Sequence, residues 1–447
     1  MLLESWSQPK YRASQILSWV HDRAVTSFDE MVNLPKALRS ILDLHATLGT
    51  LIVEAEQVSK VDGTIKRAYR LADGGIIESV LMADYEDGRR TACVSSQVGC
   101  AMGCVFCATG QMGFSRQLTS DEIYEQVVLF DRLLRGRALI GQDGANGSTG
   151  NGDSGGNSNG KANNKGNAKG KKKKSKSKTP VGGGGDGGGG GVSNVVMMGM
   201  GEPLANYKNV MSAIRRMNLE LGIGARRITV STVGVVHNIR KLVEDTPKVR
   251  LAVSLHCVDD EERTALIPAN RRYGGVDELL SAVRYYIEET GRRVTFEWAL
   301  IAGTNDGPEV ARSLGRMLVK KAKLRPDMIH VNLIPLNPTG GFDGSAPKGG
   351  KGSVREFARI LTDEFRIAAT ARVRRGIDID AGCGQLTADV ERRIRQREQE
   401  KTLLREQQLQ DQNQQPQQQH DGSVQSLHES INDNTTMITL SEQLILP

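Results

Sequence analysis

One short run of cysteines constrains this chain more than any other feature. Between Cys93 and Gly113 the sequence reads CVSSQVGCAMGCVFCATGQMG, which places Cys100, Cys104 and Cys107 at the spacing C-x3-C-x2-C. Three thiolates can hold three irons of a four-iron, four-sulfur cluster and leave the fourth iron without a protein ligand. That iron can bind a small molecule through an amine and a carboxylate. The spacing therefore predicts an iron–sulfur cluster with one open position.

Two kinds of site fit such a spacing. Phe106, directly before Cys107, completes the C-x3-C-x-aromatic-C pattern of radical S-adenosylmethionine enzymes. The alternative is a zinc site, but structural zinc takes four closed ligands, and no fourth Cys or His lies close by. We therefore favour a 4Fe-4S cluster, with S-adenosyl-L-methionine as the small molecule on the open iron.

The charge of the chain is concentrated in one segment. The formal charge is +7 over 447 residues, but residues 141–191 hold nine Lys and three Asp, so the remainder carries only +1. Global basicity is thus weak support for nucleic-acid binding by the folded part. Six cysteines, three of them in one motif, suit a reducing compartment. No run of eighteen apolar residues suggests a membrane span. We expect a cytoplasmic protein without a membrane contact, or an organellar one if a leader is missing.

Composition and periodicity divide the chain into four parts. Residues 1–60 are expected to form an N-terminal accessory domain, with helical spacing over 8–48, whereas 50–60 and 64–82 alternate like strands around a DGG turn. The expected catalytic domain covers 61–140 and 192–388. Residues 141–191 hold nineteen of the fifty glycines and are expected to form a disordered insert. Residues 389–447 are expected to form a charged helix and a Gln-rich disordered tail.

From residue 88 onward, strand-like segments alternate with helical ones. The expected strands cover residues 90–97, 193–199, 227–232, 249–255, 293–300, 328–334 and 367–373. The expected helices cover residues 120–136, 206–221, 235–244, 275–290, 307–323 and 353–365. This alternation predicts an α/β fold with parallel strands and crossover helices. In such barrels the chemistry lies at the C-terminal ends of the strands, and the cysteine loop follows the first of them.

Later segments carry a resemblance to a known family. The matching segments are KYRASQILSWV at 10–20, DGTIKRAY at 62–69, IIESV at 76–80, CVSSQVGCAMGCVFC at 93–107, MGMGEPLANY at 198–207, STVGVV at 231–236, SLH at 254–256, IPLNP at 334–338 and GIDIDAGCGQL at 376–386. In this order they resemble the radical-SAM dual-specificity rRNA and tRNA adenine-C2 methyltransferases. The resemblance implies a partial (β/α)6 TIM-like radical-SAM barrel with a small N-terminal helical domain.

The resemblance also implies how the methyl group moves. Carbon 2 of adenine is electron-poor and cannot simply attack the methyl of S-adenosylmethionine, so a radical route is needed. In the family scheme Cys383 carries the methyl group. Cys93 then attacks the sulfur of Cys383 and forms a disulfide, which releases the RNA. Glu78 is the base that takes the carbon-2 proton.

Cofactor contacts follow from the same resemblance and from position at strand ends. Gly199 and Gly201 would allow close backbone approach, and Glu202 would accept from the ammonium of S-adenosylmethionine. The further expected cofactor-binding residues are Ser231, Ser254, Leu255, His256 and Asn337. For Ser254 and His256 the alternative is a satisfied polar residue in the core. Cys257 matches no family role and is expected to be a buried structural thiol.

The expected partners are rRNA or tRNA and a flavodoxin- or ferredoxin-type electron donor, with the chain acting as a monomer. The expected RNA contacts are Lys10, Arg12, Lys66, Arg67, Arg372, Arg374 and Arg375. Three other functions stay open at this point. They are methylation of carbon 8 by a relative in the same superfamily, a different radical reaction such as enzyme activation, and a non-catalytic iron–sulfur or zinc RNA-binding protein.

Overall fold

We describe the fold from a computed structural model of the chain. The structure describes residues 2–21, 23, 25, 27–83, 87–143, 190–245, 248–347 and 351–387. Most of the expected insert at 141–191 and all of the expected tail at 389–447 lie outside these residues, so those two predictions remain predictions. Within the described residues no helix is both long enough and apolar enough to cross a membrane.

The N-terminal residues form a small helical module with its own core. Its helices are α1 (Leu2–Ser5), α2 (Tyr11–His21) and α3 (Lys36–His45). Pro35 directly precedes α3, where its fixed φ and missing N–H are tolerated. Leu38 and Leu42, four residues apart on one face of α3, are buried against Trp19 and Met31. The expected helices between residues 8 and 48 are therefore present.

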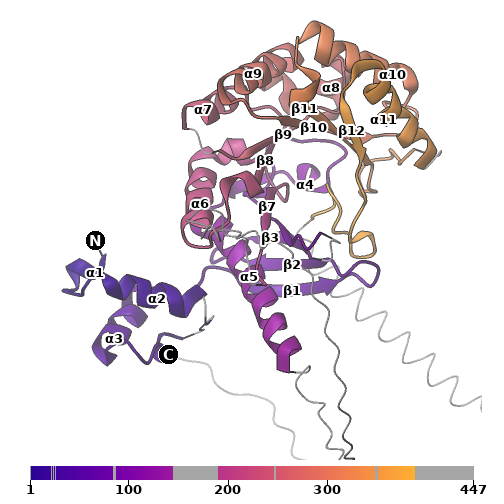
Figure 1. Cartoon of the computed structure of the whole chain (residues 1–447). Coiled ribbons are helices and arrows are strands. Elements are labelled where there is room, and N and C mark those ends of the chain that lie inside the picture. Colours follow the sequence, from indigo (N-terminus) through magenta and orange to yellow (C-terminus); the bar gives the residue numbers. More distant parts are fainter. Residues whose placement is uncertain are drawn as a thin grey trace, which may run out of the picture. The chain divides into compact units, whose positions relative to one another are not determined.

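A ten-stranded sheet forms the centre of the described residues (Figure 1). Its strands, in spatial order, are β1 (Ile52–Val58), β2 (Ile65–Arg70), β3 (Ile76–Met82), β4 (Thr91–Cys93), β7 (Asn194–Met197), β8 (Ile228–Thr232), β9 (Arg250–Ser254), β10 (Val294–Leu300), β11 (Ile329–Pro335) and β12 (Ala368–Ala371). The first three pair antiparallel up to β4, and all pairs from β4 to β12 are parallel. Because β1 belongs to this sheet, the sheet begins before residue 60, inside the segment assigned to the accessory domain.

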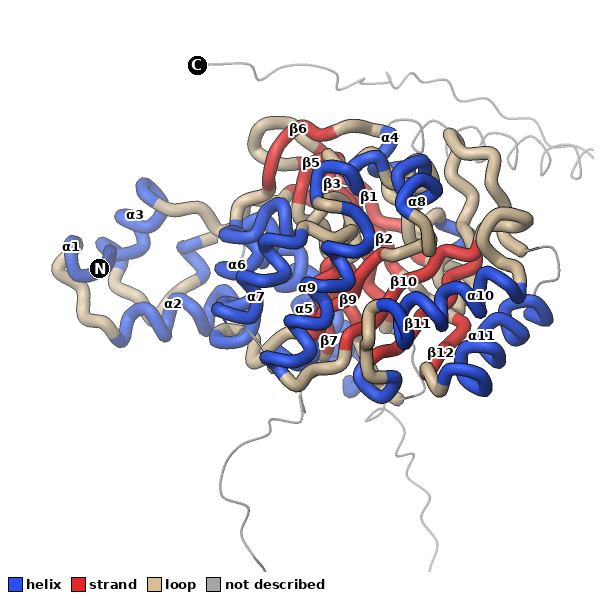
Figure 2. Tube along the Cα trace, turned by 90° about the horizontal axis from the view of Figure 1, so that it is seen from above, coloured by secondary structure: helices blue, strands red, loops and turns tan. Residues whose placement is uncertain are grey.

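Each parallel strand before β12 is followed by a helix, which gives six strand–helix units in the described part of the chain. The helices are α5 (Ser120–Asp143), α6 (Tyr207–Leu219), α7 (Val236–Asp245), α8 (Asp260–Leu266), α9 (Gly275–Thr290), α10 (Pro308–Gly315), continued by a π-helix at Arg316–Lys321, and α11 (Lys351–Phe365). The crossover helices lie along the outer side of the strands (Figure 2). The expected partial barrel is confirmed.

Local chemistry explains why these elements end where they do. Strand β10 reads VTFEWAL, and its β-branched and aromatic residues suit a strand covered on both faces. Helix α9 covers the residues expected for it and stops at Gly291, whose φ of 62° is readily adopted by glycine. Helix α5 begins at a capping box, in which Thr119 Oγ1 accepts from the Glu122 N–H and Glu122 Oε2 accepts from the Thr119 N–H.

The first expected barrel strand, at 90–97, is wrong in its extent. The chain leaves the main sheet after β4 and enters a separate two-stranded ribbon, β5 (Gln97–Gly99) with β6 (Phe114–Gln117). Ser95 marks the break, because its N–H donates to Gln126 Oε1 at 2.8 Å and its hydroxyl donates to the Glu78 carbonyl. The ribbon therefore frames the cysteine loop, with the short helix α4 (Ala108–Gln111) between its strands.

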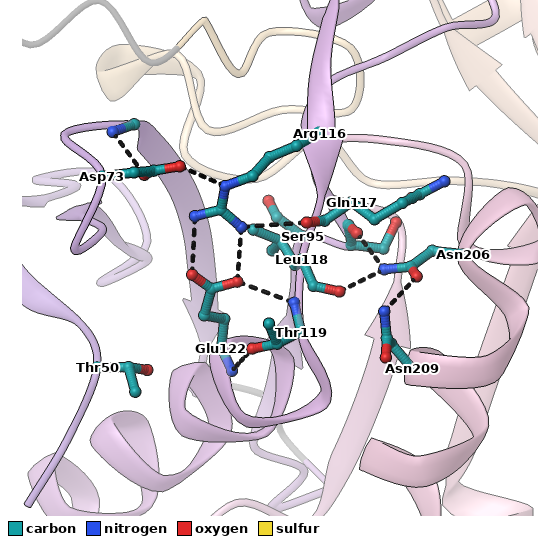
Figure 3. Close-up of polar contacts among 12 residues, drawn as sticks. Thr50, Asp73, Ser95, Arg116, Gln117, Leu118, Thr119, Glu122, Asn206 and Asn209 are labelled. Carbon is teal, nitrogen blue, oxygen red and sulfur yellow. Dashed lines mark hydrogen bonds and ion pairs between the residues drawn. The ribbon is translucent and has the colours of Figure 1, made fainter. Parts of the chain in front are cut away.

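Arg116 fixes this ribbon to the rest of the fold (Figure 3). Its two terminal nitrogens donate to the two Glu122 carboxylate oxygens at 2.9 Å, and its Nε donates to Asp73. The hydrogen bond from Arg116 is the largest cause that lowers the pKa of Asp73 to about 2. A planar guanidinium suits such two-pronged contacts. Arg116 thus joins β6, the turn between β2 and β3, and the start of α5.

Candidate active site

A cavity opens at the carboxyl ends of the parallel strands. The residues that line it from the strand ends are Met197, Met198, Gly199, Gly201, Glu202, Pro203, Ser231, Thr232, Val233, Ser254, His256, Glu297, Ala299, Ile334, Leu336, Asn337 and Arg372. The cysteine loop and the loop at 383–384 close its other side. The chemistry-bearing residues therefore meet at the end of the barrel that the strand order predicted.

The three motif cysteines all line this cavity. Cys104 is buried, and Cys100 and Cys107 are half-buried. Burial raises the pKa of all three thiols, that of Cys100 to about 12. No three Cys, His, Asp or Glu side chains of the described residues lie close enough together to hold a single metal ion. The thiolates of a four-iron cluster bind different irons, so they need not converge on one point.

Backbone hydrogen bonds fix the cysteine loop. The Cys100 N–H donates to the Gly113 carbonyl at 2.7 Å, which closes the base of the loop. The Val105 N–H donates to the Leu266 carbonyl at 3.0 Å, at the end of α8. The loop is therefore tied both to its own ribbon and to the barrel.

Cys383 lies on a loop that packs directly against the cysteine loop. The Ala108 N–H donates to the Gly384 carbonyl at 2.7 Å, and Thr109 Oγ1 donates to the Leu386 carbonyl at 2.7 Å. Asn337 Nδ2 donates to the Cys383 carbonyl at 3.1 Å. These contacts hold the backbone of Cys383 while its side chain stays exposed.

A second cavity adjoins the first and contains Cys93. Both cavities are lined by Met198, Ile334, Asn337, Arg372 and Cys383. Burial raises the pKa of Cys93 to about 12; nearby Cys383 raises it further and Arg372 lowers it. Cys383 thus stands at the junction between the cluster cysteines and Cys93.

Glu78 lies near this second cavity but lines neither one. In β3 it shares a face with Val80, which lines the second cavity and pairs directly with Cys93 across the sheet. Its carboxylate is buried, and Oε2 accepts from the Thr387 N–H at 2.9 Å. The sheet register therefore places Glu78 and Cys93 on the same face.

Glu202 presents a buried carboxylate to the first cavity. Oε1 accepts from the Leu204 N–H at 2.9 Å, and Oε2 accepts from the Val233 N–H at 2.8 Å. Burial raises its pKa to about 7, although these backbone donors favour the ionised form. The preceding Gly201 has a φ of 96°, and a Cβ there would lie 2.5 Å from Gln97 Cβ. A glycine is needed to bring Glu202 this close to the cysteine ribbon.

His256 and Asn337 add polar atoms to the same cavity. The Ala299 N–H donates to His256 Nδ1 at 2.9 Å, and burial lowers the His256 pKa to about 3. The neutral ring therefore carries its proton on Nε2. The backbone of His256 has a φ of 63°, which is rare for a non-glycine residue. Asn305 Nδ2 donates to the His256 carbonyl at 2.8 Å. Asn337 Oδ1 is buried and accepts no hydrogen bond from any other described residue.

The remaining expected cofactor residues divide into two groups. Ser231 and Ser254 line the cavity, at or beside the ends of β8 and β9. Leu255 is fully buried and is not part of the lining; its N–H donates to the Glu297 carbonyl at 3.1 Å. Cys257 is buried as expected.

Two of the expected RNA contacts are wrong. Lys66 is only 2% exposed, and its Nζ donates to the Asp380 carbonyl at 3.0 Å. Arg67 Nε donates to Glu56 Oε2 at 2.7 Å on the neighbouring strand. Both side chains are engaged within the sheet. Arg372, Arg374 and Arg375 do line the second cavity, together with Arg89, which the sequence did not single out.

The sequence also missed Glu297. This carboxylate is 4% exposed and lines the first cavity. Asn332 Nδ2 donates to Oε1 at 3.0 Å, and Arg372 Nη1 lies 3.5 Å from Oε2. A signal existed, because an acidic residue in the middle of an otherwise apolar strand needs a partner.

Arg263 was missed without any such signal. Its buried guanidinium donates to the carbonyls of Ser254 at 2.8 Å and Leu255 at 3.0 Å. It also donates to the Val233 carbonyl and to Asn270 Oδ1. One side chain therefore ties together the loops that follow β8 and β9, both of which supply cavity residues.

We expect Arg263→Met to lower the free energy of unfolding by about 3 kcal/mol or more, since it leaves several buried oxygens without a donor. Thermal unfolding of the purified protein measures this effect. Arg284→Met is the control, because the Arg284 side chain is 42% exposed and its ion pair with Glu288 is as long as 4.0 Å. Equal melting temperatures in the two variants would contradict this role.

Comparisons with known proteins agree with this geometry. Residues 1–48 match the family model of the ribosomal RNA large subunit methyltransferase N-terminal domain. The chain is 44% identical over 398 residues to a dual-specificity RNA methyltransferase RlmN 1 from Myxococcus xanthus, covering 88% of this chain and 93% of the relative. It is 45% identical to a probable dual-specificity RNA methyltransferase RlmN 2 from Opitutus terrae, covering 84% of this chain and 81% of the relative.

A solved structure extends the comparison to three dimensions. The crystal structure of a radical SAM methyltransferase from Sphaerobacter thermophilus is 40% identical to this chain, with a TM-score of 0.69. The match covers 87% of this chain and 96% of the other. Sequence and fold together establish that the chain belongs to the RlmN family of dual-specificity RNA methyltransferases.

Proposed function

We propose that this protein methylates carbon 2 of an adenosine in 23S-type rRNA and in tRNA, through a methyl group carried on Cys383. The observation that carries the proposal is the position of Cys383. It lines both the cavity of the three motif cysteines and the cavity of Cys93. A carrier that is loaded in one cavity and unloaded in the other needs this position.

The residues of the first cavity fit a 4Fe-4S cluster. Cys100, Cys104 and Cys107 are its three thiol ligands, and they leave one iron open for S-adenosyl-L-methionine. Their buried thiols have raised pKa values in the protein alone, and bound iron would reverse this by stabilising the thiolates.

The same cavity fits the polar groups of S-adenosylmethionine. Glu202 offers a buried carboxylate as an acceptor for the N–H groups of the amino group. Asn337 Oδ1 is a buried acceptor that has no donor among the described residues, and the His256 ring offers an Nε2–H donor. Ser231 and Ser254 add hydroxyl groups to the lining. An unpaired acceptor beside a cavity is satisfied when a ligand supplies the donor.

When bound, the cluster and S-adenosylmethionine supply the methyl group and the radical that removes a hydrogen atom from the methylated cysteine. Cys383 carries the resulting methylene group to carbon 2 of the adenine. The adduct would give one electron back to the cluster, Glu78 would take the proton from carbon 2, and the Cys93 thiolate would attack the Cys383 sulfur. The new disulfide breaks the bond between that sulfur and the methylene carbon. The electron pair of the broken bond stays on this carbon, which takes up a proton, so the RNA leaves with a methyl group.

The second cavity provides the approach for the RNA. Arg89, Arg372, Arg374 and Arg375 line it, and arginine forks suit phosphate groups. The target adenine leaves its stack to reach Cys383, as in other enzymes that act on a base. A flavodoxin- or ferredoxin-type protein supplies the electron. The chain acts as a monomer in the cytoplasm.

Anaerobic incubation of the reconstituted protein with S-adenosylmethionine, a reductant and unmodified RNA tests the proposal. Mass spectrometry of digested tRNA and rRNA is expected to show 2-methyladenosine, together with 5′-deoxyadenosine in the supernatant. The appearance of 8-methyladenosine would favour the carbon-8 reaction instead. No cleavage of S-adenosylmethionine would favour a non-catalytic RNA-binding protein.

The pKa of Glu202 leads to a pH-dependent prediction. Because burial raises this pKa to about 7, the carboxyl of the empty site is mostly protonated at pH 6 and mostly ionised at pH 7.5. The amino group of S-adenosylmethionine donates hydrogen bonds to the ionised form, so binding removes the proton of the carboxyl group and weakens as the pH falls. We expect S-adenosylmethionine to bind several-fold more weakly at pH 6 than at pH 7.5.

Equilibrium dialysis of the cluster-containing protein measures this dependence. The matched variant Glu202→Gln keeps the size of the side chain and removes its titration. It is expected to bind more weakly at pH 7.5 and with almost no change down to pH 6. A variant with the same pH dependence as the wild type would show that another group controls binding.

A further inference from the structure

A pocket lined by arginines lies at the end of the barrel opposite the active site. Its lining residues are Arg226, Val249, Arg250, Arg292, Arg293, Thr295 and His330. No acidic residue is among them. This concentration is local, because the chain outside residues 141–191 has a net charge of only +1.

The arginines come from the starts of neighbouring parallel strands. Arg226 precedes β8, Arg250 opens β9, and Arg292 and Arg293 precede β10. His330 lies near the start of β11. The residues of the active-site cavity lie at the other ends of the same strands. The seven residues of β10 span about 20 Å at ~3.3 Å each, so the pocket and the active site are well separated.

The guanidinium groups have donors left over. Arg292 Nη1 donates to the Lys248 carbonyl at 3.0 Å, and Arg293 Nε donates to the Ile329 carbonyl at 3.1 Å. These two hydrogen bonds position the guanidinium groups of Arg292 and Arg293 and use one nitrogen of each group. Arg226 and Arg250 are exposed, and neither guanidinium group makes a hydrogen bond or ion pair with another described residue.

Nearby titratable groups do not neutralise the pocket. Asp327 forms an ion pair with Arg325 at 2.6 Å. The hydrogen bond from Arg325 is the largest cause that lowers the pKa of Asp327, and the charge of Arg293 lowers this pKa further. Burial and the charge of Arg293 lower the pKa of His330, so its ring is neutral at pH 7. His330 Nε2 lies 2.8 Å from Thr370 Oγ1. The positive charge of the pocket therefore comes from the arginines.

We propose that this arginine pocket binds phosphate groups of the substrate RNA at a distance from the target adenosine. The inference rests on the proposed function, which makes RNA the substrate. Arginine presents a planar set of N–H donors that matches a phosphate, and neighbouring strand starts place four arginines around one pocket. A folded RNA carries phosphates far from the modified base, and such contacts position the molecule without reading its sequence.

The test compares two double variants of the full-length, cluster-containing protein. Arg226→Gln/Arg250→Gln removes two charges from the pocket. Arg215→Gln/Arg355→Gln removes two charges from exposed positions on α6 and α11 and is the matched control. Filter binding uses an unmodified tRNA transcript and, separately, a short stem-loop of it that contains the target adenosine, over a range of salt concentrations.

We expect the pocket variant to bind the whole tRNA about tenfold more weakly than the wild type, with a salt dependence smaller by about two phosphate contacts. The short stem-loop is too small to reach the pocket, so its affinity should match that of the wild type. The control should bind both RNAs like the wild type. Turnover on saturating tRNA should be unchanged in both variants.

Equal tRNA binding by the pocket variant and its control would overturn the inference, and so would an equal loss for the short stem-loop. If the pocket variant fails to fold, photo-crosslinking of the wild-type protein to tRNA tests whether the pocket contacts RNA. Crosslinks in the peptides around residues 226–250 and 292–293 support the pocket, and their absence overturns it. If the wild-type protein methylates tRNA but the pocket variant binds tRNA normally and no crosslinks form at the pocket, this inference alone is wrong. A wild-type protein that neither binds nor methylates RNA removes the proposed function as well.

Discussion

Replacing Cys93 by alanine is expected to leave RNA covalently attached to the protein, whereas replacing Cys383 by alanine abolishes the RNA product without an adduct. Cys383 lines both cavities and is the proposed carrier. Without Cys93 the described lining of the second cavity holds no other thiol that could attack the Cys383 sulfur once carbon 2 of the adenine is bound. Without Cys383 the methyl group is never loaded. The two cysteines therefore fail in different ways, each reducing released product to background.

Denaturing gels of the reaction mixtures separate these outcomes. Cys93→Ala should give a protein band shifted by the mass of the RNA, and the double variant Cys93→Ala/Cys383→Ala should not. Cys257→Ala is the control, because Cys257 is buried and lines neither cavity. It should turn over and leave no adduct. Equal, adduct-free inactivity of both single variants would mean that the two roles are wrongly assigned.

Removing one motif cysteine is expected to have the second large effect. Cys104→Ala leaves two of the three motif thiols in the cavity, and three are needed to hold a 4Fe-4S cluster with one open iron. The anaerobically reconstituted variant should lose the broad visible absorbance and most of its iron. Cleavage of S-adenosylmethionine should fall to background.

Metal analysis of the wild type and of Cys257→Ala provides the reference for this experiment. Both should contain about four irons per chain when the cluster is fully assembled. Stoichiometric zinc without iron in anaerobically purified wild-type protein would contradict the cluster and restore the zinc alternative. A Cys104→Ala variant that keeps its iron and its absorbance would contradict the ligand assignment.

The sequence predicts the barrel well because its signals are local. Parallel strands such as β10 read as short apolar runs between helical periods, and both kinds of segment follow from side-chain spacing. The cysteine spacing is equally local, so Cys100, Cys104 and Cys107 could be assigned to one site before any fold was known. The site also lies at the strand ends where barrel topology places it.

What the sequence could not give depends on contacts between distant residues. The break at Ser95 depends on a hydrogen bond to Gln126, which lies on helix α5. Lys66 looked like an exposed RNA contact because its partner, the Asp380 carbonyl, is 314 residues away in the chain. Arg263 lies in an ordinary acidic helix, and its role follows from the loops that meet it. The position of Cys383 between the two cavities also depends on contacts between distant residues, so no spacing of residues in the sequence predicts it.

The isotope content of the transferred methyl group tests the central claim most directly. Protein whose Cys383 has been methylated with trideuterated methyl is mixed with unlabelled S-adenosylmethionine, a reductant and tRNA for a single turnover. Because a hydrogen atom leaves the methyl group on Cys383 and a proton is added on release, the account predicts 2-methyladenosine with two deuterium atoms. A methyl group with three deuterium atoms, or with none, would contradict transfer through a methylene group on Cys383.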